Sequence, residues 1–402
     1  MSRVIIIGGG QAGSSLVAKL RSEGFEGQVT LIANESLPPY QRPPLSKGYL
    51  LGEMNKERLF LKPESFYRDN DIALRLEQAA VHIDPVSKTV SLGNGEELAY
   101  DALALTTGSY PRKLPSSVGG GLKGVFTVRD LSDVDLMSPY FEASRKVLVI
   151  GGGYIGLEAA AVAAKRGLSV SLIEMSDRIL KRVACPETAD YFRNLHQCNG
   201  VDIKEGVSLS YLEGEDHVQR AVLTNGSELE IDFAIVGVGI QPATELAETA
   251  GLKVENGIVT DEQARTTDKH IWAAGDCATC LHNGESIRIE SVGNAIDQAE
   301  VAACSMMGRD VAYKPSPWFW SDQYDCKLQI AGLNRGYTDV VIREGKGFRS
   351  HWYYVGNELI AVDSMNDVRG YMVGKRLIEA GKTAPKYLVS DPNSDLKPLL
   401  KN

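Results

Sequence analysis

The sequence predicts an α/β protein in which one β–α–β unit occurs twice and an α+β domain follows at the C-terminal end. Two observations predict this arrangement. The same order of strand, glycine turn, helix and strand is found at residues 4–35 and again at residues 146–174. After Pro315 the sequence pattern changes to alternating runs that are rich in aromatic and β-branched residues, which favours an antiparallel sheet. A chain of 402 residues has room for about two to four such domains.

The first unit opens the chain with an apolar strand, followed by a glycine turn, a helical pattern, a second strand and an acid. In order these are residues 4–7, Gly8, Gly10 and Gly13, residues 14–24, residues 28–33 and Glu35. This is the order that a dinucleotide-binding β–α–β unit of the Rossmann type requires. The context makes the glycine spacing far more specific than the spacing would be alone.

Each glycine of this turn has a separate physical task. Gly8 permits the tight turn, Gly10 lets a pyrophosphate approach the backbone, and Gly13 lets helix and strand pack closely. Free amides at the helix N-terminus would face the phosphates. Glu35, 22 residues after Gly13, is placed to accept hydrogen bonds from an adenosine ribose. The first unit is therefore predicted to bind a dinucleotide.

The second unit repeats this pattern and adds a specificity signal. Its parts are a strand at 146–150, glycines at 151, 153 and 156, a helix ending near Gly167, and a strand at 169–173 closed by Glu174. A carboxylate at Glu174 accepts a hydrogen bond from a free ribose 2′-hydroxyl and repels a 2′-phosphate, which favours NADH over NADPH. Arg178 and Arg182 lie nearby in sequence and would weaken this preference unless they are ordinary surface charges.

A second duplication supports the first. Residues 91–98 match residues 222–229, and both segments carry an Asn-Gly hairpin turn. Each is followed by an aspartate, an apolar strand, a glycine and a proline: Asp101, Gly108 and Pro111 in the first copy, and Asp232, Gly239 and Pro242 in the second. Two dinucleotide sites in one chain suggest electron transfer between two cofactors.

Two further segments contribute polar groups to the first site. Residues 36–47 contain four prolines, which predicts a rigid loop rather than a helix or strand and holds Arg42 and Lys47 close to the first nucleotide. Residues 266–276 are predicted as a strand that ends in Gly275-Asp276. An acid at the C-terminal end of a strand, facing a nucleotide crevice, is placed to bind ligand hydroxyls.

Composition and charge limit the partners and the compartment. The formal net charge of −9 disfavours broad binding to nucleic acids or anionic membranes. The first strand begins three residues from Met1, and no apolar run approaches membrane-spanning length, so a cytoplasmic protein is expected. Cys277 and Cys280 have C-x-x-C spacing, but buried free thiols are favoured over a redox pair, and no metal site is expected.

Together these features resemble the two-dinucleotide flavoprotein reductases of the glutathione-reductase fold. More narrowly, they resemble ferredoxin reductases of the putidaredoxin-reductase type. The resemblance runs from end to end, and its motifs are residues 8–13, 42–47 (Arg-Pro-Pro-Leu-Ser-Lys), 107–108, 128–130, 151–158, 274–276, 288–292 and 318–324. The last two motifs are specific to this branch.

The resemblance implies FAD in the first site and NADH in the second. The FAD residues that it carries over are Ala12, Lys47, Arg129, Asp276 and Val292, with Trp320 near the flavin ring, and Gly108 of the 107–108 motif is a further cofactor-binding candidate. Relatives often have Asp where this chain has Asn34, so either Asn34 or Glu35 is expected to hold the ribose, and Val81 matches a backbone contact to adenine. The NADH residues are Gly151, Gly153, Tyr154, Ile155 and Gly156 of the second fingerprint, with Glu174 and Gly239.

The same resemblance predicts three domains. Residues 1–114 and 241–316 would form a discontinuous FAD-binding domain, residues 115–240 the NAD-binding domain, and residues 317–402 the C-terminal α+β domain. It also places Lys47 and Glu158 as a facing ion pair beside the reactive edge of the flavin. There Lys47 would stabilise negative charge on the reduced flavin, Glu158 would position the ammonium, and Tyr154 would line the nicotinamide pocket.

The electron acceptor is inferred partly from what the sequence lacks. Disulfide reductases of this fold carry a cysteine pair after the first glycine loop, but residues 40–48 contain no cysteine. Electrons are therefore expected to leave the flavin edge singly, for a 2Fe-2S ferredoxin that docks electrostatically and transiently. The resemblance implies that this ferredoxin supplies a haem monooxygenase or another oxygenase. An acidic ferredoxin would need a local basic patch, and a monomer is expected.

Two alternatives stay open. One is another enzyme of the same fold, either an NADH-dependent reductase of a small molecule such as monodehydroascorbate or an NADH oxidase. The other is a flavoprotein whose redox state governs protein binding, as in proteins that resemble apoptosis-inducing factor. Members of that class usually carry a targeting segment and a long insertion in the third domain, and neither is visible here.

Overall fold

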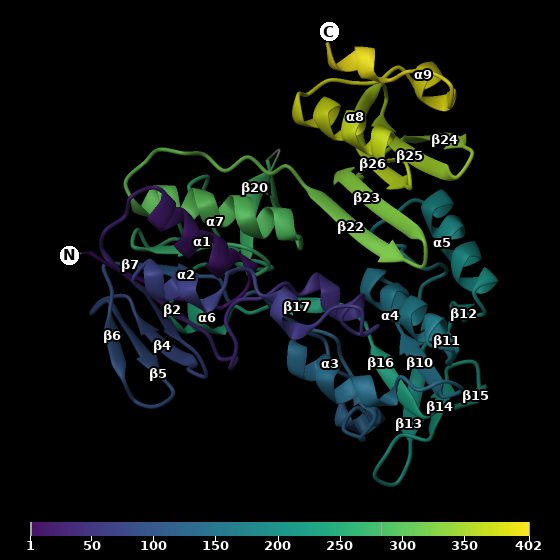
Figure 1. Cartoon of the computed structure of the whole chain (residues 1–402), viewed down its shortest axis with the longest axis horizontal. Coiled ribbons are helices and arrows are strands. Elements are labelled where there is room, and N and C mark those ends of the chain that lie inside the picture. The colour runs from purple at the N-terminus through teal and green to yellow at the C-terminus, as the bar shows by residue number, and fades with distance from the viewer. Residues whose placement is uncertain (1, 283, 402) are drawn as a thin grey trace. The chain divides into compact units, whose positions relative to one another are not determined.

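The computed structural model describes residues 2–282 and 284–401. The chain divides into two compact units (Figure 1). Unit 1 comprises Met1–Gln41, Lys56–Tyr110 and Gln241–Pro317, and unit 2 comprises Arg42–Asn55, Pro111–Ile240 and Trp318–Asn402. Two short strands, β8 (Ser109–Pro111) and β17 (Ile240–Pro242), lie where the chain passes between the units.

Unit 1 is built on a parallel sheet. Its strands, in spatial order, are β19 (Ile271–Ala273), β7 (Ala102–Leu105), β1 (Arg3–Ile7), β2 (Gln28–Ile32) and β3 (Ile72–Arg75). Strand β1 is central, and its side chains alternate between two cores because successive residues of a strand face opposite sides. Ile6 packs in one core with Leu16 and Leu20, whereas Ile5 packs in the other with Val90.

Different elements cover the two faces of this sheet. Helices α1 (Gln11–Ser22) and α7 (Val292–Met306) pack against one another on the first core (Figure 1). The second core lies under an antiparallel meander of β4 (Ala80–Asp84), β5 (Thr89–Leu92) and β6 (Glu97–Ala99), and under α6 (Glu245–Thr249). The remaining elements are η2 (Lys56–Leu59), α2 (Glu64–Asp69), β18 (Ile258–Val259), β20 (Ala278–His282) and β21 (Glu285–Ile287).

Unit 2 contains a second parallel sheet that copies the first. In spatial order its strands are β12 (Asp202–Glu205), β11 (Ser169–Glu174), β10 (Lys146–Ile150), β16 (Phe233–Val236) and β9 (Val125–Phe126). Helix α4 (Tyr154–Lys165) follows β10 as α1 follows β1. The other helical segments of this part are η1 (Pro43–Ser46), η3 (Ser116–Val118), α3 (Leu131–Met137), η4 (Ser138–Tyr140) and α5 (Pro186–Cys198).

The duplication extends to an irregularity of the meanders. The second meander consists of β13 (Leu209–Glu213), β14 (Arg220–Leu223) and β15 (Glu228–Glu230). In the first meander the register shifts between Ala80 and His82, and in the second it shifts between Leu209 and Tyr211. Both shifts fall near the start of the first meander strand, where an extra residue leaves the ladder. The internal repeat is therefore structural as well as sequential.

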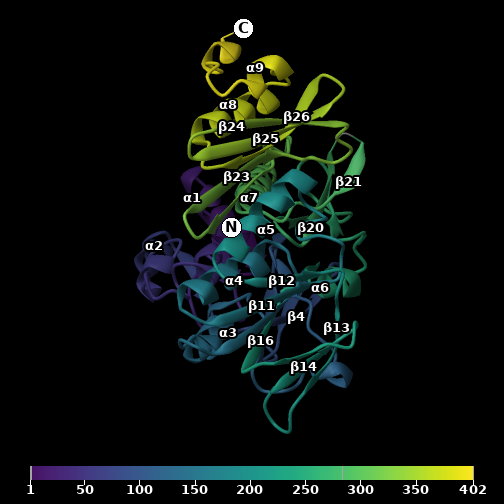
Figure 2. The same ribbon diagram turned by 90° about the vertical axis from the view of Figure 1, so that its right-hand side faces the viewer.

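The C-terminal part of unit 2 is an antiparallel sheet covered by helices, as Figure 2 shows. Its strands, in spatial order, are β22 (Trp318–Gln323), β23 (Cys326–Gly332), β26 (Glu358–Met365), β25 (Phe348–Val355) and β24 (Asp339–Gly345). Helix α8 (Val368–Glu379) packs on it and is followed by α9 (Lys386–Ser390) and η5 (Lys397–Leu400). Gly374 of α8 must lack a side chain, because a Cβ there would lie 2.6 Å from the Val362 side chain. The predicted α/β class with an α+β C-terminal part is confirmed.

Two local predictions were wrong in detail. The proline-rich loop contains one 3₁₀ turn, η1, because prolines fit the first turn of a helix, where no backbone donor is needed. Of the strand predicted over residues 266–276, only β19 forms. The reason is a turn: the Asp268 carboxylate accepts a hydrogen bond from the backbone N–H of His270, at 2.7 Å, and bends the chain before Ile271.

None of the helices in the described residues combines the length and the apolar character that a bilayer crossing requires.

Two buried histidines are predicted to make stability depend on pH. His196 on α5 and His351 on β25 are fully buried, and burial lowers the pKa of His196 to about 4 and that of His351 to about 3, from 6.5. As the pH falls below 6.5, the unfolded chain therefore binds protons before the folded chain does. The free energy of unfolding should fall by about 1.4 kcal/mol per pH unit for each histidine, until the folded pKa is reached.

Urea unfolding between about pH 7.5 and about pH 5 measures this dependence. His196→Gln removes one of the two proton-binding groups, so its stability should fall less steeply than that of the wild type. Equal pH dependence in the two proteins would contradict the assignment.

Candidate functional site

The first glycine turn, between β1 and α1, has the geometry of a phosphate cradle. Gly8 has a φ of +120°, and a Cβ there would lie 2.1 Å from the backbone oxygen of Thr106. A Cβ on Gly13 would lie 2.1 Å from the Gly8 oxygen. Gly10, by contrast, faces open space, and a Cβ there would meet nothing within 4 Å. The outer glycines are thus needed for packing, whereas the middle one leaves room for a ligand.

The helix that follows leaves its N-terminus available. Gly10 is the N-cap residue of α1, and no side chain caps the helix there. The first amides of a helix lack partners within the helix and carry its positive dipole end, so they favour an anion. Open space next to such amides fits the pyrophosphate of a dinucleotide.

Gly275-Asp276 is brought to this cradle by close packing. The backbone at Gly275 adopts a φ of +84°, and a Cβ there would lie 3.2 Å from the Cβ of Ala12 on α1. The next residue, Asp276, accepts a hydrogen bond from the Ser109 hydroxyl at 2.9 Å. The backbone oxygen of Asp276 accepts another from Arg288, at 3.2 Å. The acid is therefore held in place beside the N-terminal turn of α1.

The predicted ribose and adenine contacts lie after β2 and on β4. Glu35 accepts a hydrogen bond from the Tyr40 hydroxyl, which orients its carboxylate, whereas Asn34 is exposed. Val81 is 55% exposed and stands at the register shift of β4, between Ala80 and His82. A residue at such a shift leaves its place in the ladder, so its backbone is open to a ligand.

Other residues predicted to contact FAD lie at turns and element ends. In unit 2, Arg42 donates a hydrogen bond to the backbone oxygen of Arg129 at 3.0 Å, so these two residues adjoin. In unit 1, Gly108 has a φ of +73°, and its oxygen accepts from the backbone N–H of Ala243 at 3.0 Å. Val292 begins α7, directly after the N-cap residue Ser291.

The second cradle, between β10 and α4, has the same design. Gly151 has a φ of +108°, and a Cβ on Gly156 would lie 2.1 Å from the Gly151 oxygen. Gly153 faces open space and is the N-cap residue of α4, again without a capping side chain. Ile155 is exposed at the start of this helix, and Gly239 has a φ of +100°. This site fits a second dinucleotide.

Glu174 at the end of β11 presents a fixed carboxylate beside the second cradle. One carboxylate oxygen accepts from the backbone N–H of Gly152 at 2.8 Å, and the other accepts from that of Ser176 at 2.7 Å. Each oxygen keeps a second lone pair for a ribose hydroxyl. Arg178 has one buried nitrogen without a hydrogen-bond partner among the described residues, and Arg182 is exposed.

Lys47 and Glu158 form an ion pair in unit 2. The Lys47 ammonium lies 2.6 Å from one Glu158 oxygen, Oε2, and also donates to the Pro43 backbone oxygen at 3.2 Å. The Glu158 side chain is 3% exposed and that of Lys47 is 16% exposed. A largely buried pair is screened little by salt, and removing one member would leave a buried charge uncompensated.

Two hydroxyls that the sequence did not assign complete the surroundings of Glu158. Ser46 donates to Oε2 at 2.6 Å, and Ser321 of β22 donates to Oε1, also at 2.6 Å. Both serines stand inside motifs that carry the family resemblance. Their roles were not predicted because a hydroxyl gives no sequence signal of which distant carboxylate it will meet.

The predicted aromatic residues also take defined places in unit 2. Trp320 stacks on Trp318, with ring centroids 5.5 Å apart and an angle of 21° between the planes. Tyr154, at the start of α4, packs against Phe319 with centroids 4.8 Å apart. The Tyr154 hydroxyl is buried without a hydrogen-bond partner among the described residues, and burial raises the pKa of this side chain.

Comparison with known proteins decides the family. Residues 2–299 match the family described as pyridine nucleotide-disulphide oxidoreductase, and residues 318–400 match the reductase C-terminal domain. The chain belongs to the pyridine nucleotide-disulphide oxidoreductase family. The resemblance to the putidaredoxin-reductase type is confirmed as well, because the relatives match along nearly the whole chain.

Three relatives illustrate how far the similarity extends. A ferredoxin–NAD(P)(+) reductase of Sphingomonas sp. is 40% identical over 96% of each chain. A rubredoxin–NAD(+) reductase of Pseudomonas putida is 39% identical, over 84% of this chain and 89% of its own. The crystal structure of a covalent putidaredoxin reductase–putidaredoxin complex aligns with a TM-score of 0.96 and 35% identity, covering 100% of this chain and 98% of that one.

The cysteines of this pyridine nucleotide-disulphide oxidoreductase are not arranged as a disulfide pair. All six are free, and Cys277 and Cys280 are buried, as predicted. The Cys277 thiol donates to the backbone oxygens of Leu105 and Ala274, at 3.4 Å each. Burial raises the pKa of Cys277, and it raises that of Cys280 to about 11, so both stay protonated and unreactive near neutral pH. Among the described residues, no group of side chains is arranged to hold a metal ion.

Proposed function

We propose that this protein is an FAD-containing NADH:ferredoxin reductase. It would pass electrons from NADH through FAD to a 2Fe-2S ferredoxin, which in turn supplies a haem monooxygenase or another oxygenase. The observation that carries the proposal is the pair of matching dinucleotide cradles in one chain, each with an open middle glycine, Gly10 or Gly153, and an uncapped helix N-terminus. Full-length similarity to reductases of electron-carrier proteins supports it.

The proposal assigns the two cradles to different cofactors. FAD would be held by Gly8, Gly10, Ala12, Gly13, Asn34 or Glu35, Arg42, Lys47, Val81, Gly108, Arg129, Asp276, Val292 and Trp320. NADH would be held by Gly151, Gly153, Tyr154, Ile155, Gly156, Glu174 and Gly239. Residues 1–114 with 241–316 would form the FAD-binding domain, residues 115–240 the NAD-binding domain, and residues 317–402 the C-terminal domain.

The chemistry that bound FAD supplies is acceptance of a hydride from NADH and release of the two electrons one at a time. The protein supplies orientation and charge. Lys47 provides a positive charge for the negative charge that develops on reduction, and Glu158 fixes the position of the ammonium. Glu174, whose carboxylate is fixed by the backbone amides of Gly152 and Ser176, would hold the nicotinamide nucleotide through its ribose. Hydride transfer from NADH to FAD requires no side chain that acts as an acid or base on the nicotinamide carbon.

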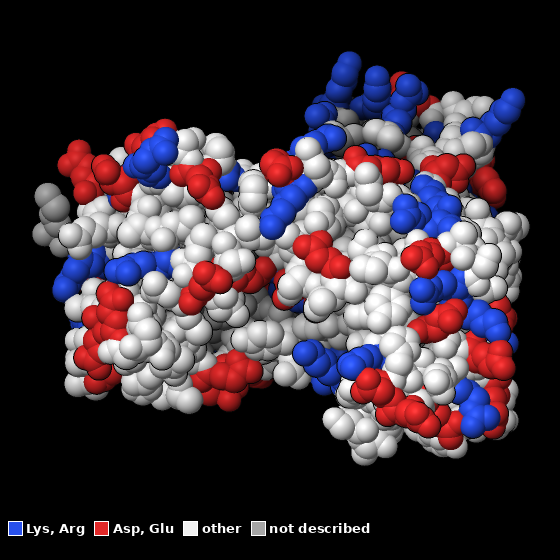
Figure 3. All heavy atoms as spheres, turned by 60° about the horizontal axis from the view of Figure 1, so that its bottom comes forward, with Lys and Arg blue, Asp and Glu red and all other residues white. Residues whose placement is uncertain are grey.

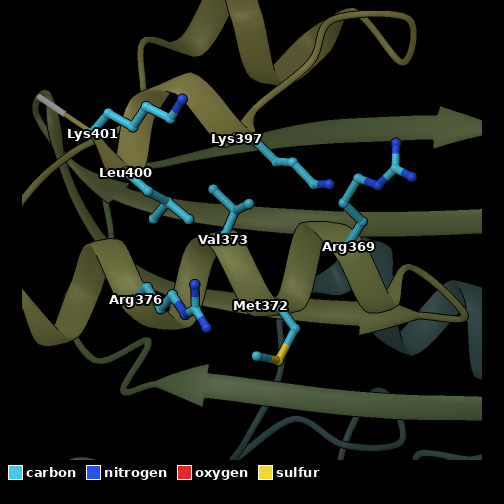
Figure 4. Close-up of a pocket in the computed structure, with 7 residues that line it drawn as sticks. All are labelled: Arg369, Met372, Val373, Arg376, Lys397, Leu400 and Lys401. Atoms are coloured by element: carbon cyan, nitrogen blue, oxygen red, sulfur yellow. The ribbon is translucent and has the colours of Figure 1, made fainter.

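The electrostatic docking of a ferredoxin is supported by a basic surface on the helical segments α8 and η5 of the C-terminal part of unit 2. Figure 3 shows Lys and Arg side chains gathered over this part of unit 2. A hollow of about 380 Å³ in this part is lined by four cations, which are Arg369 and Arg376 of α8, Lys397 of η5 and Lys401. Met372, Val373 and Leu400 line it as well, and Figure 4 shows all seven side chains. In residues 2–282 and 284–401, none of the four forms an ion pair.

Reversing charge at this basic hollow should weaken docking without affecting flavin reduction. Arg376→Glu and Lys397→Glu, combined, are expected to raise the KM for an acidic ferredoxin on the order of tenfold at low salt, because rim charges steer encounter. The rate of flavin reduction by NADH should not change. Lys346→Glu makes the same type of charge change in the exposed turn between β24 and β25 and is the control. Equal KM values for the wild type and both variants would show that docking occurs elsewhere.

The alternative acceptors are less well supported. A disulfide substrate would need a reactive cysteine pair, whereas Cys277 and Cys280 are buried thiols with raised pKa values. Monodehydroascorbate or dioxygen would need no protein-docking surface. A redox-governed binding protein like apoptosis-inducing factor would not need rapid turnover. The relatives add one more acceptor, a rubredoxin, which is another small iron-containing electron carrier.

The proposal also includes a cytoplasmic location and a monomeric state. Five of the six free cysteines are buried thiols, which is usual in a reducing compartment where NADH is available. A monomer is expected because the proposed third domain would block the dimer surface of disulfide reductases, and gel filtration with light scattering checks it.

Steady-state turnover with several acceptors tests the proposed function. The FAD-loaded protein should oxidise NADH rapidly in the presence of a 2Fe-2S ferredoxin and slowly with monodehydroascorbate or dioxygen. Faster turnover with a rubredoxin would move the assignment to that carrier. Preference for monodehydroascorbate would replace ferredoxin by a small-molecule acceptor and leave the cofactor assignment in place.

A further inference from the structure

We infer that Ser321 of the C-terminal sheet is a positioning residue for the reduction of FAD. It fixes one oxygen of Glu158 so that the other oxygen is directed to Lys47. The inference rests on the proposed function and deepens it, because it assigns a role in the NADH half-reaction to a domain that holds neither glycine cradle.

The inference rests on the different hydrogen-bond partners of the two Glu158 oxygens. Oε2 accepts hydrogen bonds from Lys47 and Ser46, at 2.6 Å each. Oε1 accepts a hydrogen bond from Ser321, also at 2.6 Å. A carboxylate is free to rotate about its last bond unless both ends are held. Ser321 therefore sets the carboxylate plane, and with it the position of the ammonium that shares the opposite oxygen.

Ser321 is itself fixed by a chain of hydrogen bonds that runs along β22. The side-chain amide of Gln323 donates to the Ser321 oxygen at 3.1 Å, so the serine proton is directed to Glu158. The amide oxygen of Gln323 faces Nε2 of His196 at 2.8 Å, which places a proton on Nε2. The other ring nitrogen of His196 then accepts from the Tyr324 hydroxyl at 3.1 Å. Every donor in the chain points toward Glu158.

Three members of this hydrogen-bond chain are buried, Tyr324 at its outer end is half-buried, and the donors all point in one direction. Ser321 and His196 are fully buried, and Gln323 is 1% exposed. Burial lowers the pKa of His196 to about 4, so the ring is neutral and its tautomer is set by its two partners. Aligned hydrogen bonds in a medium of low dielectric polarise one another and strengthen the last bond, here the bond to Glu158. No competing charge lies within this chain of four residues.

Removing the Ser321 hydroxyl should slow hydride transfer through a change in Lys47. Ser321→Ala frees Oε1, so the carboxylate turns and the ammonium loses its fixed place. In the FAD-loaded protein, flavin reduction by NADH should slow about tenfold. The midpoint potential of the bound FAD should become more negative, because the reduced form loses part of its stabilisation. The KM for NADH should equal that of the wild type, because the substitution does not alter the NADH cradle.

A matched control and a rescue variant separate positioning from packing. Ser364, in β26 of the same sheet, is fully buried, and its hydroxyl has no hydrogen-bond partner among the described residues. Ser364→Ala should leave both the rate and the potential at wild-type values. Ser321→Thr keeps the hydroxyl and should restore most of the rate.

A double-mutant cycle with Lys47→Met tests whether Ser321 acts through the ion pair of Lys47 and Glu158. If Ser321 acts through the ion pair, Ser321→Ala should have little further effect in the Lys47→Met background. Additive losses, or a wild-type FAD potential in Ser321→Ala, would overturn the inference. Either result would leave the proposed function intact as long as wild-type protein still transfers electrons from NADH to a ferredoxin.

Discussion

Replacing Lys47 by methionine is expected to slow flavin reduction by NADH roughly 10- to 100-fold, the effect of losing one charged hydrogen-bond donor at the reacting group. The Lys47 ammonium is shared between Glu158, at 2.6 Å, and the Pro43 backbone oxygen, at 3.2 Å. Methionine has similar length and no charge, so the apolar contacts of the side chain are kept while the charge is lost. Stopped-flow absorbance under anaerobic conditions measures the rate.

Loss of Lys47 also leaves Glu158 buried with only its two serine donors, so the variant must be shown to retain its fold and FAD. Its flavin spectrum and FAD content should match those of the wild type. Lys204→Met is the matched control: it removes a lysine that is 30% exposed and paired with Asp202 at the edge strand β12. That control should reduce its flavin at the wild-type rate. A Lys47→Met rate within about twofold of the wild type would exclude the electrostatic role of Lys47.

Replacing Glu174 by arginine is expected to invert the nucleotide preference. The carboxylate is held by the backbone amides of Gly152 and Ser176 and is proposed to accept hydrogen bonds from ribose hydroxyls. Arginine would lose these bonds and provide a cation for a 2′-phosphate. The loss for NADH and the gain for NADPH each amount to roughly tenfold, so the ratio of kcat/KM values should change about 100-fold. Arg178, one nitrogen of which is buried without a hydrogen-bond partner among the described residues, would assist the binding of the phosphate.

The control for this change is Asp177→Arg. Asp177 is 71% exposed and pairs with Lys181, so the same reversal of charge is made three residues away, on the surface. The nucleotide preference of this control should stay that of the wild type. An unchanged kcat/KM ratio in Glu174→Arg would remove Glu174 from the ribose site. A parallel loss for both nucleotides would indicate damage to the Gly152 turn instead.

Local patterns account for the parts of the fold that the sequence predicted well. The glycines at 8, 10 and 13 and at 151, 153 and 156 are recognised from their spacing within one strand–turn–helix unit, and for Gly13 and Gly156 the steric reason also lies within that unit, at the Gly8 and Gly151 oxygens. The central strand of each parallel sheet, β1 or β10, is a short apolar run that ends at one of these turns. The meanders were found by comparing the chain with itself, since each copy serves as evidence for the other.

Contacts between distant residues account for what the sequence did not predict. Ser321 and Glu158 are 163 residues apart, and nothing near either residue indicates that they meet. The ion pair of Lys47 with Glu158 was expected only from family resemblance, because its partners are 111 residues apart. The turn at Asp268 is a local contact that the sequence reading overlooked. There one side-chain hydrogen bond shortens the strand that was predicted over residues 266–276. The basic hollow was missed because its cations are spread over two segments, α8 and the last residues of the chain.

The most direct test of the central claim is a sequential anaerobic stopped-flow measurement. FAD-loaded protein is mixed with one equivalent of NADH and then with a 2Fe-2S ferredoxin, and the flavin and ferredoxin absorbances are followed separately. Flavin bleaching should be followed by recovery of oxidised flavin as two ferredoxins are reduced, fast at low ionic strength and slow at high. Bleaching that persists while every ferredoxin offered stays oxidised would contradict the account.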